Sequence, residues 1–209
     1  MVGGELLRIC AALGLLSILP LCVLGGLGPQ IPSIASFTPS NGSFELSSTV
    51  RIIVDSKFAN HGSPSLLDFA KTFQKDLEEV VPFATVPAVS ESSIVPGHSS
   101  GHPTIYLTLN SSASFVLYNG QPTDEGYQFE VTPDTYLISA PAPIGVWWGT
   151  RTLLQHAAVS LAQGAKAVSF PAGVGVDSPG WEIRGFMLDA GRHWFEASFL
   201  GMGYALYAA

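Results

Sequence analysis

The chain has 209 residues, and its composition, 47% hydrophobic against 12% charged, excludes an intrinsically disordered protein, which combines low hydrophobicity with high charge. Nine lysines and arginines stand against 16 aspartates and glutamates, so the net charge is −7, and no basic cluster favours nucleic acid as a partner. The 22 glycines and 15 prolines argue against a helical bundle, and no internal repeat is visible.

The chain begins with an apolar segment, residues 9–27, which follows a basic residue and is interrupted by Pro20. This pattern is typical of a secretory signal peptide, which we expect over residues 1–28. The alternative is an uncleaved signal anchor, because the segment approaches the roughly 20 residues that span a bilayer. Cys10 and Cys22 both lie inside it, so the mature chain would have no disulfide. Once the segment is cleaved off, we also expect no stable membrane association.

Two acceptor triplets for N-linked glycosylation support export. Asn41-Gly42-Ser43 and Asn110-Ser111-Ser112 both fit the required N-x-S/T pattern. Such triplets often arise by chance, but they gain weight behind a signal peptide. We therefore expect glycans on Asn41 and Asn110, and a location outside the cell or in a vacuolar or lysosomal compartment.

The first part of the mature chain predicts two strands and a helix. Phe44–Leu46 and Val50–Asp55 read as strands, the second with the period-two alternation of a half-buried strand. Ser63-Pro64 predicts the helix start, with serine as N-cap and proline in the first turn. Apolar residues then follow at helical spacing, up to a stop at Pro82: Leu66, Phe69, Ala70, Phe73, Leu77 and Val80.

The next hundred residues or so predict the remainder of a small domain. Residues 87–103 are rich in proline, serine and glycine, which is typical of a loop, and Thr104–Leu109 predicts a strand. Gly126–Val131 and Thr135–Ser139 flank a turn sequence and predict a hairpin. Pro141–Gln163 predicts a second helix. Four or five strands with two helices indicate an α+β domain over residues 29–163, about the usual domain size.

The composition changes after this domain. Residues 164–180 are rich in Gly, Ala, Val and Pro, which predicts a linker. Beyond it, Phe186–Leu188 predicts a short strand, Gly191 ends that strand, and a helix is expected from Arg192. One strand, one loop and one helix are the first unit of a βα repeat, which we place in residues 181–209.

Two patterns suggest catalytic chemistry but lack its structural context. Residues 97–101 fit the G-x-S-x-G elbow of serine hydrolases, which needs a strand before it and a helix after it, whereas here a strand follows. His98 and His102 are four positions apart, the spacing at which helical histidines share a metal. Two serines and a glycine lie between them, so a helix there is not expected. We interpret both patterns as loop sequence and expect neither a metal nor a cofactor.

Two pairs of carboxylates also fail as acid–base pairs. Asp124-Glu125 stands at the start of a predicted strand, where an exposed turn needs charged residues for solvation, so we interpret it as structural. Glu182 and Asp189 are separated by about 23 Å if the segment between them is extended. The two carboxylates of a glycosidase are about 5 Å apart in retaining enzymes and up to about 9.5 Å apart in inverting ones, so this pair cannot act on one bond.

Asp189 and Arg192 form the remaining candidate site. They lie at the end of the predicted Phe186–Leu188 strand and in the loop after it. In a (β/α)8 barrel that end of a strand carries the active site, and a guanidinium there can bind two neighbouring hydroxyls of a ligand. The alternative is an Asp–Arg ion pair that stiffens the loop, and spacing alone favours it.

Four stretches together resemble a known family. They are Glu125-Gly126-Tyr127, residues 145–155, Asp177-Ser178-Pro179, and residues 184–195 with an Arg-Gly pair, an apolar run, Leu-Asp and Arg-His. Their order and spacing over roughly residues 30–200 resemble glycoside hydrolase family 20, the β-N-acetylhexosaminidases.

The resemblance implies a small α+β domain followed by a (β/α)8 barrel. It also implies substrate-assisted chemistry, in which the N-acetyl oxygen of the substrate attacks the anomeric carbon, an exception to two-carboxylate retention. By resemblance, Arg192 binds hydroxyls of the terminal N-acetylhexosamine, Asp189 is a positioning group that ends the first barrel strand, and Arg184 is structural. The family's adjacent Asp-Glu pair lies on a later barrel strand, and Asp124-Glu125 does not correspond to it.

The chain departs from the family in length. A barrel needs about 250 residues, and only residues 181–209 follow the predicted linker. We therefore interpret the chain as a truncated β-N-acetylhexosaminidase whose partner would be a glycan, which we expect to be inactive, and for which no oligomeric state is predicted. The alternative is a secreted non-catalytic module that packs against a partner or binds glycan.

Overall fold

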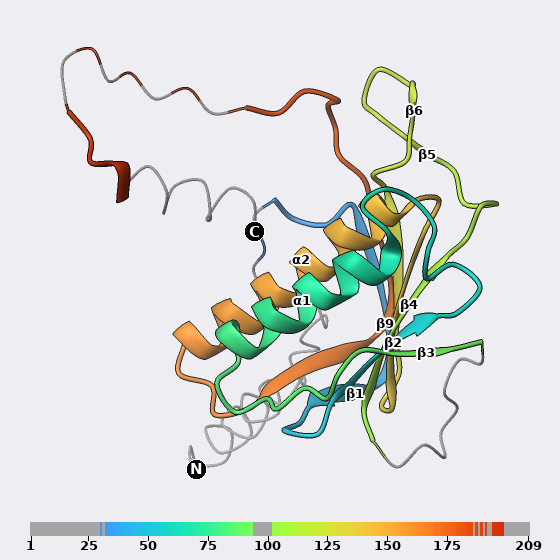
Figure 1. The fold of residues 1–209 in the computed structure, drawn as a ribbon, viewed down its shortest axis with the longest axis vertical. Coiled ribbons are helices and arrows are strands. Elements are labelled where there is room, and N and C mark those ends of the chain that lie inside the picture. Colours follow the sequence, from blue (N-terminus) through green and yellow to red (C-terminus); the bar gives the residue numbers. More distant parts are fainter. Residues whose placement is uncertain are drawn as a thin grey trace, which may run out of the picture.

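A computed structural model describes residues 30, 32–93, 102–185, 187, 189, 191 and 194–198. These residues form a seven-stranded sheet with two helices on one face, plus a small separate two-stranded sheet (Figure 1). The elements in chain order are β1 Ser36–Leu46, β2 Arg51–Asp55, α1 Leu66–Val80, β3 Ser90–Ser92, β4 Thr104–Leu109, β5 Phe115–Val116, β6 Pro122–Thr123, β7 Tyr127–Val131, β8 Thr135–Ala140, α2 Pro143–Ala162 and β9 Val168–Asp177.

The large sheet is mixed, with strand order β1-β9-β7-β8-β4-β2-β3. β3, β2, β4 and β8 are parallel neighbours, whereas β7 is antiparallel to both β8 and β9, and β1 is antiparallel to β9. The predicted hairpin of β7 and β8 and the predicted strand β4 are confirmed. The predicted α+β class is also confirmed, although the sheet has more strands than expected.

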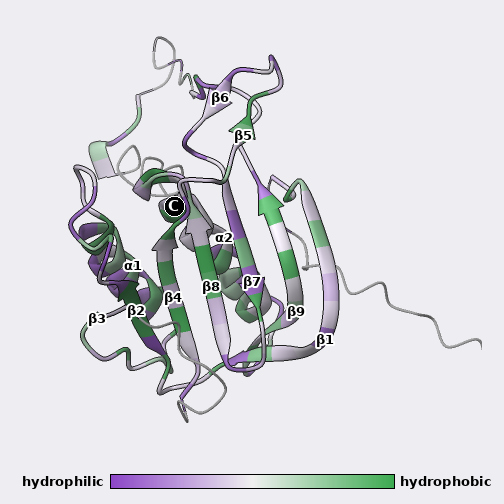
Figure 2. Ribbon diagram, turned by 90° about the vertical axis from the view of Figure 1, so that its right-hand side faces the viewer, coloured by the Kyte–Doolittle hydropathy of each residue, from purple (hydrophilic) through white to green (hydrophobic). Residues whose placement is uncertain are grey.

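The core lies between the sheet and the helices, and it is rich in aromatic side chains. Apolar and polar residues alternate along the strands, as Figure 2 shows, so that one face of the sheet is apolar toward α1 and α2. At the centre, the Tyr136 ring stacks on Phe129 with centroids 5.6 Å apart and meets Phe170 edge to face at 5.2 Å. All three side chains are fully buried, and burying each of the two phenylalanine rings contributes about 1.5–3 kcal/mol or more.

Helix α1 begins two residues later than predicted. Its N-cap is Ser65, whose hydroxyl accepts a hydrogen bond from the Asp68 backbone N–H at 3.2 Å, while the Asp68 carboxylate accepts one from the Ser65 N–H at 3.1 Å. This reciprocal capping box satisfies two backbone donors at the helix start. The bonds from Ser65 lower the pKa of the Asp68 carboxyl. The expected start at Ser63-Pro64 was therefore wrong in position, although the helix itself is confirmed and ends before Pro82.

Two other predicted segments differ in the structure. The linker predicted over residues 164–180 contains β9, the strand that joins β1 to β7 inside the sheet. The loop predicted over residues 87–103 contains the short edge strand β3, and its residues 94–101 lie outside the described part of the chain.

After β9 the chain leaves the sheet as an extended arm (Figure 1). We define the arm as the described residues between 178 and 198. Where the arm is described it contains no strand, so the predicted βα unit is not confirmed, and only Ala197 and Ser198 are helical. Met187 and Trp194 are 89% and 80% exposed. Across the described residues, no helix has the length and apolar character needed to span a bilayer.

Candidate functional site

One edge of the sheet gathers most of the polar groups that the sequence motifs supply. The carboxyl ends of the parallel strands β4 and β8 lie there, because Leu109 pairs with Ala140. The start of β7 and the end of β9 lie there too, because Tyr127 pairs with Asp177. Helix α2 begins directly after β8, so its first turns lie at the same edge.

A partly buried hydrogen-bonded cluster stabilises this edge. The Tyr127 hydroxyl donates to an Asp177 carboxylate oxygen at 3.1 Å and also contacts the Thr152 hydroxyl of α2. The other Asp177 oxygen accepts the Ala35 backbone N–H at 3.1 Å. Burial raises the pKa of the Asp177 carboxyl, and burial together with the Asp177 carboxylate raises the pKa of the Tyr127 hydroxyl. The cluster joins β7, β9, α2 and the segment before β1, which is a structural role.

Glu125 connects the domain to the arm. One of its carboxylate oxygens, Oε2, accepts the indole N–H of Trp148 in α2 at 2.8 Å. The same oxygen accepts the Nη2–H of Arg184 in the arm, and the two side chains form an ion pair. The Arg184 guanidinium also lies over the Trp148 ring, 5.5 Å from its centroid. Glu125 is therefore half-buried and bound from two sides, not a solvated turn residue as predicted.

A second set of contacts holds the arm just before Arg184. The Gly180 carbonyl accepts the Tyr118 backbone N–H at 2.9 Å. The Tyr118 ring lies so close to Gly180 that a Cβ there would be 2.2 Å from a ring carbon, so a larger residue would have to displace this exposed ring. Tyr118 and Trp181 meet edge to face at 5.9 Å, and both rings remain exposed.

The structure does not test the predicted sugar-binding pair. Asp189 is exposed and accepts the Gly191 backbone N–H at 2.8 Å, which closes a local turn. Arg192 lies outside the described residues, so neither its predicted contact with a sugar nor the alternative ion pair is tested.

The other sequence patterns have no side-chain contact with this edge in the part of the chain that the structure describes. Residues 97–101, the G-x-S-x-G pattern, and His98 lie outside the described part of the chain. Glu182 and Asp124 are both exposed. Among the described residues, no group of three or more His, Cys, Asp or Glu side chains is placed to hold a metal ion.

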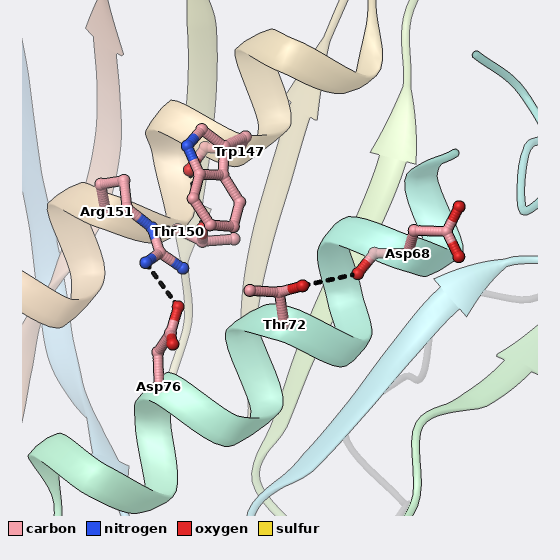
Figure 3. A network of polar contacts seen from close by, with 6 residues as sticks. All are labelled: Asp68, Thr72, Asp76, Trp147, Thr150 and Arg151. Atoms are coloured by element: carbon pink, nitrogen blue, oxygen red, sulfur yellow. Dashed lines mark hydrogen bonds and ion pairs between the residues drawn. The ribbon is translucent and has the colours of Figure 1, made fainter. Parts of the chain in front are cut away.

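Among the described residues, the charged side chain that is most deeply buried lies between the two helices. The Arg151 guanidinium of α2 pairs with the Asp76 carboxylate of α1 at 2.6 Å and lies 3.7 Å from the centroid of the Trp147 ring (Figure 3). Burial lowers the pKa of Arg151, and Asp76 opposes that shift. The pair joins the two helices away from the edge that holds Glu125, so we assign it to stability.

Sequence reasoning missed the role of Glu125. Its contacts reach 23 positions ahead to Trp148 and 59 positions ahead to Arg184, beyond any local pattern. A signal was nevertheless present, because all three residues lie in the stretches that carry the family resemblance.

Comparison with known proteins agrees with the fold and the motifs. The model of glycosyl hydrolase family 20, domain 2, matches residues 29–177. A search of curated proteins gave no match.

Three solved structures are similar over 84% of the chain. They are N-acetyl-β-hexosaminidase of Streptomyces plicatus in complex with Thio-NAglucal (20% identity, TM-score 0.59), exo-β-N-acetylglucosaminidase of Vibrio harveyi in complex with N-acetylglucosamine (20%, 0.55) and β-N-acetylhexosaminidase of Bacteroides fragilis (21%, 0.55). The chain spans 31%, 23% and 30% of these proteins, respectively. At such identities the likeness shows the fold.

The family match covers the whole sheet and both helices, from before β1 to the end of β9. It ends at Asp177, where the arm begins. The chain belongs to glycosyl hydrolase family 20 through this second domain of the family.

Proposed function

We propose that the chain is the N-terminal part of a β-N-acetylhexosaminidase, which hydrolyses terminal non-reducing N-acetylhexosamine by the substrate-assisted retaining route. The observation that carries this proposal is the family-20 match over residues 29–177. Similar structures are described with N-acetylglucosamine bound, in the Vibrio harveyi enzyme and as product in the Streptomyces plicatus D313N mutant, which supports a glycan as the substrate.

In this proposal the described domain is a support and the arm leads into the sugar site. Arg192 would bind two hydroxyls of the terminal sugar, since a guanidinium presents two parallel N–H groups. Asp189 would hold the neighbouring turn. The reaction also needs an acid that protonates the leaving oxygen, and residues 181–209 contain no adjacent Asp-Glu pair to supply it.

We expect no turnover from the 209-residue chain. The purified chain is incubated with 4-nitrophenyl N-acetyl-β-glucosaminide, and release of nitrophenol is followed by its absorbance. The Streptomyces plicatus enzyme serves as the positive control, and circular dichroism confirms that the chain is folded. Release that scales with chain concentration and co-purifies with the chain would contradict this prediction, because it would require an acid within these residues.

We also propose that the chain enters the secretory pathway and is glycosylated at Asn41 and Asn110. Both side chains are exposed, Asn41 where the register of β1 shifts between Pro39 and Ser43, and Asn110 directly after β4. Asn110 Oδ1 accepts the Ser112 backbone N–H at 3.1 Å in a local turn.

This proposal is tested by the intact mass of the chain secreted from eukaryotic cells. We expect loss of residues 1–28 and two glycans, with one glycan lost in each of Asn41→Gln and Asn110→Gln. A secreted chain that carries no sugar, or one that retains residues 1–28, contradicts the corresponding part of the proposal.

A further inference from the structure

Besides the Tyr118–Gly180 contacts, a compact set of residues attaches the arm to the domain, and we call this set the exit latch: Glu125, Trp148, Trp181 and Arg184. Its centre is Glu125 Oε2, which accepts two hydrogen bonds, from the Trp148 indole and from the Arg184 guanidinium. Hydrogen bonds to an ionised acceptor are about twice as strong as neutral ones. A single carboxylate oxygen therefore joins α2, the turn before β7 and the arm.

Arg184 also makes a contact within the arm itself. While Nη2 donates to Glu125, Nη1 donates to the Trp181 carbonyl at 2.6 Å, so the guanidinium closes a turn within the arm. The planar fork can make both bonds at once, which a lysine ammonium cannot do in the same geometry. The arm is thus held in one conformation over residues 181–184 as well as being tied to the domain.

The surroundings favour the ion pair. The Arg184 and Glu125 side chains are 41% and 23% exposed, so water screens the pair less than it screens a fully exposed one. The Trp148 ring lies under the guanidinium and adds a cation–π contact. Just before the latch, the Tyr118–Gly180 hydrogen bond also ties the arm to the domain.

The position of the latch along the chain gives it a functional meaning. Arg184 of the latch lies only five residues before Asp189. Met187 and Trp194, which follow the latch, are highly exposed. We propose that Glu125 is a positioning residue that, through Arg184, fixes the direction in which the chain leaves the small domain toward Asp189. The part concerning Asp189 rests on the proposed function; the latch itself does not.

Limited trypsin digestion tests the latch, because trypsin cleaves after Arg184 only when this segment opens. In Glu125→Gln the amide oxygen can still accept the Trp148 indole, but the charge that binds Arg184 is lost. We expect cleavage after Arg184 to become about twofold to fivefold faster, because cleavage follows the population of the open segment and a partly exposed ion pair is worth this much. Cleavage after Lys166, in the exposed loop before β9, is the internal reference and should not change.

Asp124→Asn is the matched control, because it removes the same charge from the adjacent, exposed residue. Its cleavage after Arg184 should stay at the wild-type rate. Equal rates in Glu125→Gln and Asp124→Asn would overturn the latch, as would an increase that the Lys166 reference shares.

A second variant keeps the latch testable if Glu125→Gln does not fold. In Arg184→Lys the charge is retained but the fork is lost. The Tyr118 backbone amide, which donates to the Gly180 carbonyl of the arm, should therefore exchange hydrogen about threefold or more faster, with the exchange of β7 and β8 unchanged. Unchanged exchange of the Tyr118 amide would overturn the proposal. Neither readout involves a sugar, so the proposed function could fail without changing either result, and the two failures are distinguishable.

Discussion

Replacing Gly145 by alanine is expected to destabilise the domain by about 3 kcal/mol, the cost of overpacking a site that cannot relax. In an ordinary helix this substitution stabilises by up to about 1 kcal/mol, because glycine is a poor helix former. Gly145 lies in the first turn of α2, and a Cβ there would be 2.4 Å from the Gly126 carbonyl oxygen and 2.9 Å from that of Asp124. Both are backbone atoms, so α2 would have to move away from the start of β7.

The measurement is urea denaturation followed by circular dichroism, with Gly185→Ala as the matched control. A Cβ at Gly185 would meet nothing within 4 Å, so this variant should unfold at the wild-type urea concentration. Gly145 packs against the carbonyl oxygens of Asp124 and Gly126, the residues on either side of Glu125. A Cβ there should therefore also displace Glu125, and we expect Gly145→Ala to make Arg184 more accessible to trypsin. A Gly145→Ala chain as stable as wild type would show that the helix does not approach the sheet this closely.

Local sequence patterns were sufficient to predict some elements of the fold, whereas close packing contacts hid one of them. The β7–β8 hairpin and β4 carry β-branched and aromatic residues with clear turn signals, and the periodicity of α1 is strong, so local chemistry was sufficient. β9 was mistaken for a linker because its composition is rich in small residues. Gly175 is small because the Phe129 ring lies against it, where a Cβ would be 2.0 Å from a ring carbon. Glycine in this strand therefore reflects packing against an aromatic core, which no local pattern reveals.

The candidate site was harder to predict for a related reason. A turn composition around Asp124-Glu125 predicted exposure, and for Asp124 the structure agrees. Glu125 is covered because two residues distant in the sequence reach it, one from α2 and one from the arm. Local sequence describes the backbone at such a position, whereas the environment of the carboxylate depends on how strands and helices assemble. Only the resemblance to the family indicated that these stretches belong together.

The second large effect is expected at the ion pair between the helices. Asp76→Ala removes the carboxylate and leaves the Arg151 guanidinium, whose side chain is 7% exposed, without its partner. Arg151 Nη2 is already buried without a hydrogen bond within the described structure, so without Asp76 only the weak Nε contact with Thr150 and the Trp147 ring remain. Breaking a buried pair by removing one partner costs about 3–5 kcal/mol, and because Asp76 is 31% exposed we expect about 2–3 kcal/mol here.

Removing both charges should be much less harmful than removing one. In the double variant Asp76→Leu/Arg151→Met, apolar side chains of similar length fill the space against Trp147, and we expect a free energy of unfolding within about 1 kcal/mol of wild type. Glu79→Ala, which removes an exposed acid from the same helix, should change it by less than about 0.5 kcal/mol. If the double variant is as unstable as Asp76→Ala, the pair contributes true net stabilisation and the desolvation argument fails. If instead Asp76→Ala unfolds like Glu79→Ala, water reaches the guanidinium, and the helices are held together by the apolar contacts of α1 and α2 alone.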